Sequence, residues 1–358
     1  MRWIKTTHLF IYFIFFSHAI AFTQTKKVYS KNGMQVLFIG DSNTEIGNIT
    51  IGLSEVLDSI YGNYGSGYCT LNPHSVGLVP DSLKISCDTN WSYFDMRDAM
   101  QPEQPPYYSP NGLSISSSTR DATSTVEFYG NAVDLYYLQT KSKGSFTVSI
   151  DDEEKTIIRL RAHSIKTKKI TINNLNDGHH VMTIKNISGI ITLLGVDAKA
   201  KNKTNKRYVV HKWGNAWSSS QEFLGIDKNV FSSALQLLKP TIVTILIGTN
   251  DYNLDNRSPA DFKNNLETLV LRIKKVLPGI PVLIVSTFDT DGEKGKTILS
   301  HYVATSFPEA AKETGVYYWD MYHWFGSYDS KKLDDGVHVK RQYGKQIAEK
   351  IYNVISDL

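Results

Sequence analysis

The sequence predicts an α/β protein whose parallel sheet is interrupted by an all-β, jelly-roll-like sandwich. Near both ends of the 358-residue chain, short apolar runs alternate with longer helical patterns. That alternation is typical of a parallel sheet covered by helices on both faces. Between residues 88 and 204, short alternating runs separated by turn residues replace the helices. This second pattern is typical of a β-sandwich.

Five apolar, strand-like runs make up the expected parallel sheet. They lie at about residues 34–40, 207–212, 241–247, 281–287 and 316–320. Helices are expected at about 46–61, 229–239, 259–277, 299–314 and 341–356. In the third helix, Leu266, Leu269, Val270, Ile273 and Val276 recur at helical spacing, which indicates a buried face.

The expected sandwich divides the α/β unit into residues 22–87 and 205–358. Its strand-like runs lie at 125–129, 133–137, 146–150, 169–172, 181–184 and 190–194. Lys143-Gly144 and Asn176-Asp177-Gly178 are turn signals between them. Four prolines between 102 and 110 mark the approach to the insertion, and the polar run 199–206 marks its exit.

Residues 1–21 read as a secretory signal peptide. Arg2 and Lys5 precede the apolar run 9–16, and Ala19-Ile20-Ala21 is a small-x-small cleavage site. The apolar run is shorter than the ~20 residues that a membrane span requires. No Cys follows the cleavage site, which argues against a lipoprotein anchor. We therefore expect a secreted or periplasmic protein without stable membrane insertion after signal cleavage.

Charge and cysteine usage narrow the classes of partner. The net charge is only +4, and no basic cluster points to nucleic acid. Cys69 and Cys87 would enter an oxidising compartment, where a bridge between them and two free thiols are both open. No Cys/His spacing indicates a metal site, so we predict no metal and no other cofactor.

Polar clusters follow two of the apolar runs, and a third lies near the end of the chain. They are Gly40-Asp41-Ser42, Gly248-Thr249-Asn250-Asp251 and Asp335-Gly336-Val337-His338. Ligands of open α/β sheets bind at the carboxyl ends of the strands. A Ser hydroxyl is a weak nucleophile until a base takes its proton, and an imidazole needs a third group to orient it. We predict Ser42 as nucleophile, His338 as base and Asp335 as orienting acid, with Asp334 as the competing acid.

The three clusters resemble the sequence blocks of the SGNH/GDSL hydrolases, serine esterases and lipases with a flavodoxin-like, three-layer fold. The resemblance implies that the Ser42 amide, the Gly214 amide and the Asn250 side chain bind the oxyanion. The second block of that family falls at Gly214 and Asn215 of this chain. Relatives often read Gly-x-Asn-Gly-Ala there, a register that places Asn215 against the glycine.

The layout also resembles SGNH peptidoglycan O-acetylesterases in which a carbohydrate-binding-like sandwich is inserted between the first and second blocks. GDSNTE and the glycine-rich segment 61–68 carry this likeness. It implies an esterase that removes O-acetyl groups from a glycan, with cell-wall peptidoglycan as the first candidate. The alternatives are another acylated glycan, a lipid, or an inactive glycan-binding protein, and intact Ser42, Asn250 and His338 argue against the last. We expect the insertion to act on large substrates and not on the chemistry.

Overall fold

The structure is a computed structural model that describes residues 33–77, 80, 82–98, 104–153, 156–201, 206–291 and 296–358. The predicted signal peptide lies outside the described residues, as do Pro102 and part of the exit run, residues 202–205. None of the helices in the described part combines the length and the apolar composition that crossing a membrane requires.

A five-stranded parallel sheet forms the centre of the α/β part, as predicted. Its order is β13-β1-β14-β15-β16, and every pairing is parallel. The strands are β1 (Gly33–Gly40), β13 (Arg207–Gly214), β14 (Ile242–Leu246), β15 (Val282–Val285) and β16 (Tyr317–Trp319). Gly40 at the end of β1 lies level with Gly214 of β13 and Leu246 of β14. Three loops that follow strands therefore meet beside the end of β1.

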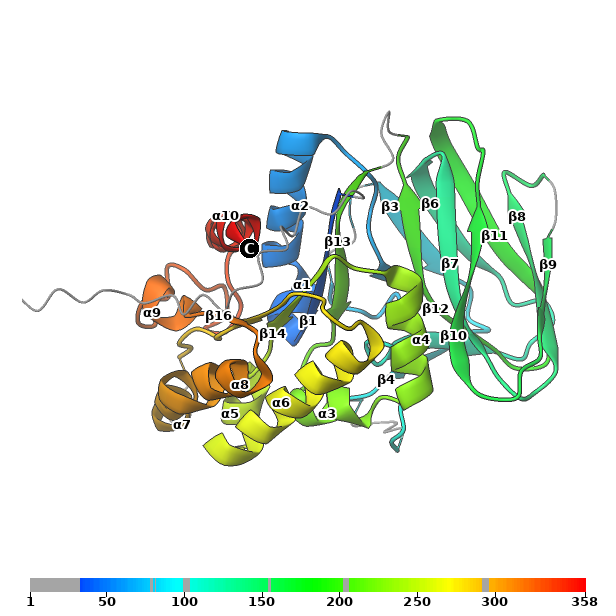
Figure 1. Cartoon of the computed structure of the whole chain (residues 1–358). Helices are drawn as coiled ribbons and strands as arrows, with labels where there is room; N and C mark the ends of the chain where they lie inside the picture. Colours follow the sequence, from blue (N-terminus) through cyan, green and yellow to red (C-terminus); the bar gives the residue numbers. More distant parts are fainter. Residues whose placement is uncertain are drawn as a thin grey trace, which may run out of the picture.

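Helices cover both faces of this sheet because the side chains of β1 alternate between two apolar cores. Val36 and Phe38 belong to one core, and Leu37 and Ile39 belong to the other. The first core includes α2 (Asn48–Tyr61) and α10 (Arg341–Asp357). Figure 1 shows these two helices on one side of the sheet. The opposite side carries α4 (Lys228–Leu238), α6 (Pro259–Val276), α7 (Lys296–His301) and α8 (Phe307–Thr314).

Short helices depart from the sequence prediction. The helix expected at 46–61 is present as α2, and an additional short helix that was not predicted, α1 (Ser42–Ile46), precedes it across Gly47, which has a φ of 95°. The helix expected at 299–314 contains a π-helical turn, η2 (Tyr302–Ser306), between α7 and α8. Three other one-turn helices were not predicted, because each is too short to show a helical repeat: α3 (Ser220–Gly225), α5 (Thr249–Asn253) and α9 (Met321–Phe325).

The predicted sandwich is present as two antiparallel sheets around a separate apolar core. One sheet contains β10 (Lys166–Ile172), β7 (Ala132–Gln139), β12 (Ile191–Lys199), β5 (Leu113–Ser117), β4 (Ser92–Asp95) and β2 (Cys69–Thr70). The other contains β3 (Leu83–Cys87), β6 (Ser124–Gly130), β11 (Gly178–Ser188), β8 (Gly144–Ile150) and β9 (Thr156–Leu160).

The sandwich begins earlier than the predicted boundary at residue 88. β2 pairs with β12, and β3 pairs with β6, so residues 69–70 and 83–87 belong to it. β2 is only two residues long, too short to show an alternation, whereas β3 does alternate apolar and polar residues over its five positions. Both cysteines are free thiols here. Burial raises the pKa of Cys69 to about 11, which keeps that thiol protonated.

The sandwich is fixed to the edge of the parallel sheet by polar contacts. Arg207 at the start of β13 forms an ion pair with the fully buried Asp197 of β12, with a nitrogen–oxygen distance of 2.7 Å. The backbone amide of Tyr68 donates to Nδ1 of His211 at 2.9 Å. Burial lowers the pKa of His211 to about 3, so its ring stays neutral. The sandwich and the α/β part therefore meet through a buried, ordered junction.

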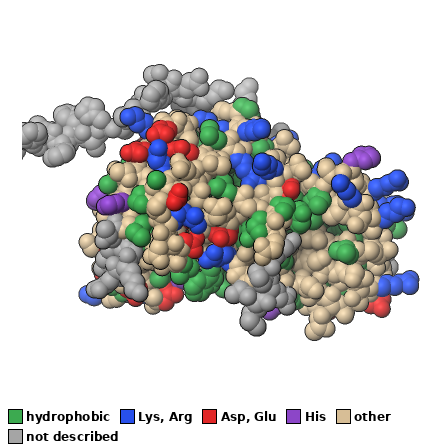
Figure 2. Space-filling model, turned by 90° about the horizontal axis from the view of Figure 1, so that it is seen from below, with side chains coloured by type: hydrophobic (Ala, Val, Ile, Leu, Met, Phe, Trp, Pro, Cys, Tyr) green, Lys and Arg blue, Asp and Glu red, His purple; other side chains and the backbone are tan. Residues whose placement is uncertain are grey.

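Both signs of charge occur on the surface. Figure 2 shows Lys and Arg side chains interspersed with Asp and Glu side chains on the face seen from below. This face therefore presents no extended field of a single sign.

Candidate active site

Ser42 begins the first helix after β1, and the local sequence explains its position at the end of that helix. The carboxylate of Asp41 caps α1 by accepting from the Asn43 amide at 3.1 Å. Ser42 is the first residue of α1. Amides in the first turn of a helix have no acceptor within the helix, so the Ser42 amide is directed at the space beyond the helix end. The positive end of the helix dipole points the same way.

The three predicted triad residues form one hydrogen-bonded chain. His338 Nε2 lies 2.8 Å from Ser42 Oγ, and His338 Nδ1 lies 2.6 Å from Asp335 Oδ2. The other oxygen of Asp335 accepts from the His338 amide at 2.9 Å. Asp334 contributes its backbone amide, which donates to the His338 carbonyl. The structure therefore brings Asp335, and not Asp334, to the imidazole.

The Asp335 carboxylate is held in its ionised form. Burial alone would raise its pKa, but hydrogen bonds from the His338 ring and from the amides of His338 and Val337 outweigh burial and lower the pKa. A carboxylate at Nδ1 fixes the imidazole with Nε2 as the acceptor that faces the Ser42 hydroxyl. This arrangement is suited to removing the Ser42 proton.

A second Asp-x-x-His motif has the same local geometry without a nucleophile. His323 Nδ1 lies 2.6 Å from Asp320 Oδ2, and the His323 amide donates to Asp320 Oδ1 at 3.1 Å. The His323 side chain is 71 % exposed, whereas that of His338 is 24 % exposed. The contact with Ser42 distinguishes the two.

Asn250 lies on α5, directly after β14. Its side-chain nitrogen donates to the Ser218 carbonyl at 2.9 Å. A primary amide carries two N–H groups, so one remains for a ligand. Asn250 is buried, and its neighbour Thr249 donates to, or accepts from, Thr287 on the next loop at 2.8 Å. The Asn250 amide is therefore held in place before any substrate arrives.

Replacing Asn250 with Ala is expected to lower kcat for a small acetate ester by about 100- to 1,000-fold, the usual cost of removing one oxyanion donor. The matched control is Asn253→Ala, which removes a partly buried amide from the same short helix. Steady-state kinetics on both variants measure the difference. Equal losses in the two variants would show that the effect comes from disturbing α5.

The second block does not supply the donor that the sequence predicted. The Asn215 amide donates to the Gly40 carbonyl at 3.1 Å, so it is not free. The Gly214 carbonyl accepts from Asn111 at 3.3 Å on the other side of β13. Because N–H and C=O of one strand residue point to the same side, the Gly214 amide also faces away from β1. The amide role predicted for Gly214 is therefore not supported.

Gly214 has a packing role instead. A Cβ atom at this position would lie 2.3 Å from the Glu45 nitrogen and 2.6 Å from its Cα. Glycine is thus required because the backbone of α1 passes directly against the end of β13. The geometry leaves two donors for an oxyanion: the Ser42 amide and the Asn250 side chain.

Two residues of the insertion contact the loop that follows β13, whereas no insertion residue in the described part of the chain hydrogen-bonds to a side chain of the triad. Asn111, in the loop before β5, donates to Gly214. Asn215 Nδ2 donates to Asp95 Oδ1, at the end of β4, at 3.0 Å. Both residues come from the sandwich, and both support the loop that follows β13. No local pattern signals these contacts, because they join residues more than a hundred positions apart.

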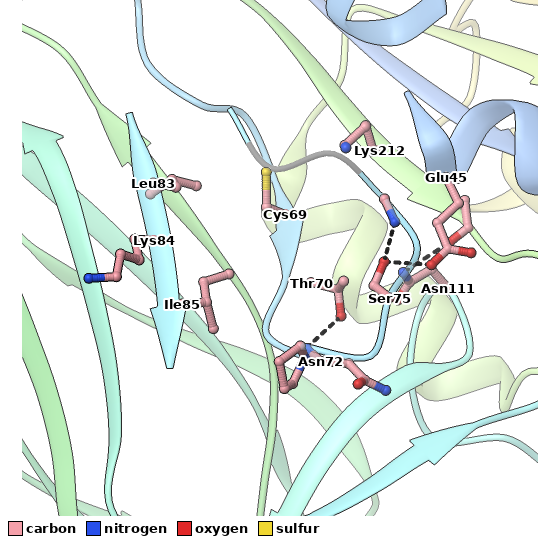
Figure 3. Close-up of a pocket in the computed structure, with 13 residues that line it drawn as sticks. Glu45, Cys69, Thr70, Asn72, Ser75, Leu83, Lys84, Ile85, Asn111 and Lys212 are labelled. Carbon is pink, nitrogen blue, oxygen red and sulfur yellow. Dashed lines mark hydrogen bonds between the residues drawn. The ribbon is translucent and has the colours of Figure 1, made fainter. Parts of the chain in front are cut away.

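Glu45, three residues after Ser42, ties two loops to the helix that begins with Ser42. Its buried carboxylate accepts from the Ser75 hydroxyl, from the Val76 amide at 3.1 Å, and from the Ala216 amide. Burial raises its pKa, against the opposing effect of these hydrogen bonds. Figure 3 shows Glu45 and Ser75 on one wall of a cavity, with β3 on the opposite wall.

This cavity, of about 320 Å³, lies at the junction of the α/β part and the sandwich. Glu45 and Gly214 line it, whereas Ser42, Asn250 and His338 do not. The cavity is therefore not lined by the triad. The lining of the cavity includes the partly buried Lys212, whose pKa is lowered by burial.

Replacing Glu45 with Gln is expected to lower the free energy of unfolding by about 1–3 kcal/mol, because the amide cannot accept from all three donors and leaves a buried donor unsatisfied. kcat should fall as well, since Ala216 loses its anchor beside Asn215. Urea unfolding and ester kinetics measure the two effects. Glu55→Gln, on the exposed face of α2, should change neither. A stability equal to wild type in Glu45→Gln would contradict this role.

Asp41 and Asp251 organise the loops. Asp251 accepts from the Ser220 amide at 2.9 Å and pairs with Arg257 at 2.8 Å. Burial raises the pKa of Asp41 and of Asp251 to about 6. In the described part of the chain, no group of three or more His, Cys, Asp or Glu residues is arranged to hold a metal ion.

Part of the chain matches a known protein family. Residues 197–342 match the GDSL-like Lipase/Acylhydrolase family, a segment that contains Asn250, Asp335 and His338. This part of the chain is therefore a GDSL-type ester hydrolase segment. A comparison with curated proteins found no match to this sequence.

Solved structures share the fold of this GDSL-type hydrolase. A structure described as a peptidoglycan O-acetylesterase in action is 14% identical, with a TM-score of 0.71 over 92% of this chain and 93% of that chain. A family two carbohydrate esterase from Cellvibrio japonicus is 13% identical over 77% of this chain and 98% of that chain, with a TM-score of 0.32. The first likeness shows that the GDSL-type hydrolase has the SGNH fold with its inserted β domain.

Proposed function

We propose that the protein is a secreted serine esterase that removes O-acetyl groups from a carbohydrate polymer, with peptidoglycan as the first candidate, through an acyl-enzyme on Ser42. The observation that carries the proposal is the hydrogen-bonded chain from Asp335 through His338 to Ser42. Secretion is supported by the signal-like sequence at residues 1–21.

The geometry suits a two-step acyl transfer. Ser42 Oγ attacks the ester carbonyl while its proton passes to His338 Nε2, and the carbonyl electron pair becomes an oxyanion. The Ser42 amide and the Asn250 side chain donate to that oxyanion. The C–O bond then breaks, and His338 returns the proton to the leaving sugar hydroxyl. In the second step, water attacks the acyl carbon while one of its protons passes to His338 Nε2. The bond to Ser42 Oγ then breaks and His338 returns the proton to Oγ, which releases acetate and restores the free hydroxyl.

A polymeric glycan is supported by the arrangement of the sandwich. It is fixed to the sheet edge beside the candidate site, and two of its residues support the loop after β13. A module in that position adds a wide surface next to a small reaction centre. The fold shared with a peptidoglycan O-acetylesterase makes the O-acetylated cell wall the first substrate to test.

The test is release of acetate from a panel of acetylated substrates, including O-acetylated peptidoglycan, acetylated xylan and a chromogenic acetate ester. We expect release from at least one polymer, with the highest kcat/KM on peptidoglycan, and full activity in EDTA. Ser42→Ala serves as the blank. Release from the small ester but from no glycan would overturn the glycan assignment. Loss of activity in EDTA with recovery on added zinc would overturn the serine mechanism.

A further inference from the structure

Trp217 is the single exposed residue in an otherwise buried segment, residues 213–220, beside the candidate site. It is 63 % exposed, whereas its neighbours Ala216 and Ser218 are 7 % and 0 % exposed. An indole that stays in water gains little from burial, so packing within the fold does not account for it. Its surface is available to a ligand.

The backbone of Trp217 is held in the left-handed region, with a φ of 65°. The other described non-glycine residues with positive φ are five Asp or Asn residues and Lys239, which ends α4. Short polar side chains tolerate this region, whereas a bulky aromatic one is strained there. Trp217 therefore keeps an unfavourable conformation that a different residue would relieve.

Hydrogen bonds on both sides impose this conformation. Before Trp217, the Ala216 amide donates to Glu45 on the nucleophile helix. After it, the Ser218 carbonyl accepts from Asn250, and the Ser218 hydroxyl donates to Asn215 at 2.5 Å. Strained residues that their surroundings fix in this way cluster at active sites and ligand clamps. Here the fixing groups are α1, which carries Ser42, and the candidate oxyanion donor itself.

We propose that the Trp217 indole is a stacking platform for a sugar ring of the acylated glycan. The inference rests on the proposed function and names how the polymer is held. One face of a pyranose ring presents C–H groups, which pack on the electron-rich face of an aromatic ring and bury apolar surface on both sides. Trp217 directly precedes Ser218, whose carbonyl accepts from the Asn250 side chain. A ring stacked on the indole therefore lies next to the reaction centre. It binds the glycan and takes no part in bond breaking.

The decisive experiment compares a polymeric and a small substrate. In Trp217→Ala, kcat/KM for the acetylated glycan should fall about tenfold, mainly through a higher KM, as expected when one aromatic contact is lost. kcat/KM for the chromogenic acetate ester should stay within about twofold of wild type, because the variant loses only a contact with the glycan, which the small ester does not make. Trp217→Phe should lie between the two on the glycan.

Trp324→Ala is the matched control, since Trp324 is 39 % exposed and lies on α9. It should leave both activities unchanged. Equal losses on both substrates in Trp217→Ala, or no loss on either, would overturn the platform. Failure of the proposed function is recognised separately, because wild type would then release no acetate from any glycan.

A second variant tests the strain. Glycine adopts positive φ freely, so Trp217→Gly should raise the midpoint of urea unfolding while lowering activity on the glycan as much as Trp217→Ala does. A midpoint below that of Trp217→Ala would show that the backbone at this position is not strained, and would remove that support for the platform. Binding of a deacetylated glycan fragment, followed by calorimetry, should weaken in both variants.

Discussion

Replacing Ser42 or His338 with Ala is expected to lower kcat by at least about 10,000-fold on every ester tested, because nucleophile and base act as one unit and either loss removes attack. Hydrolysis of a chromogenic acetate ester and release of acetate from a glycan measure the effect. Urea unfolding of each variant should match wild type within about 1 kcal/mol, since surface and site substitutions away from the core change stability little.

The control for His338 is His323→Ala. His323 has the same contacts with its own Asp, but it lies on α9 and is 71 % exposed at the side chain. Its loss should leave kcat within about twofold of wild type, as usual for an exposed residue away from the site. A large loss in His323→Ala, with a small one in His338→Ala, would exchange the roles of the two motifs.

Replacing Asp335 with Asn should lower kcat by about 1,000- to 10,000-fold, because an amide at Nδ1 no longer holds the imidazole with Nε2 facing the nucleophile. The partial exposure of Asp335 should not reduce this loss of kcat, because the substitution acts through the orientation of the His338 ring. Ester kinetics at a fixed pH measure it.

Asp334→Asn is the neighbouring comparison. The contact of Asp334 with His338 uses its backbone amide, which the substitution keeps. Activity should therefore stay close to wild type. If Asp334→Asn were the more damaging of the two, the orienting acid would be Asp334, the alternative that the sequence left open. The lowered pKa of Asp335 adds a second check. Because this carboxylate is already ionised, its own titration should not contribute to the acidic limb of the rate profile near neutral pH.

Sequence reasoning located the strands and the triad because each has a local signal. Apolar β-branched runs predicted all five strands of the parallel sheet, and the polar residues after them predicted Ser42 and Asn250. Local signals do not separate two identical motifs, however. Asp320 and His323 have the same spacing as Asp335 and His338. The three-dimensional fold distinguishes the two pairs, because it brings His338 to Ser42.

Long-range support of the site was out of reach of the sequence. Glu45 shows no pattern that marks it as an anchor, because its donors lie in two distant loops. Asp95 and Asn111 belong to a part of the chain that we expected to be separate from the chemistry. The orientation of the Gly214 amide depended on strand pairing, which the motif does not specify. Residues such as Trp217, by contrast, were visible as aromatics near a motif, but their exposure and backbone conformation were not.

The position of the sandwich between β1 and β13 has a consequence for the order of folding. β1 leaves the ribosome first, yet its neighbours β13 and β14 begin only at Arg207 and Ile242. Strands of the sandwich are consecutive in the chain, so we expect that module to close while the apolar β1 is still unpaired. Its closure brings β2 beside β12, which leads directly into β13. The inserted module would thus shorten the search of β1 for its partner during synthesis.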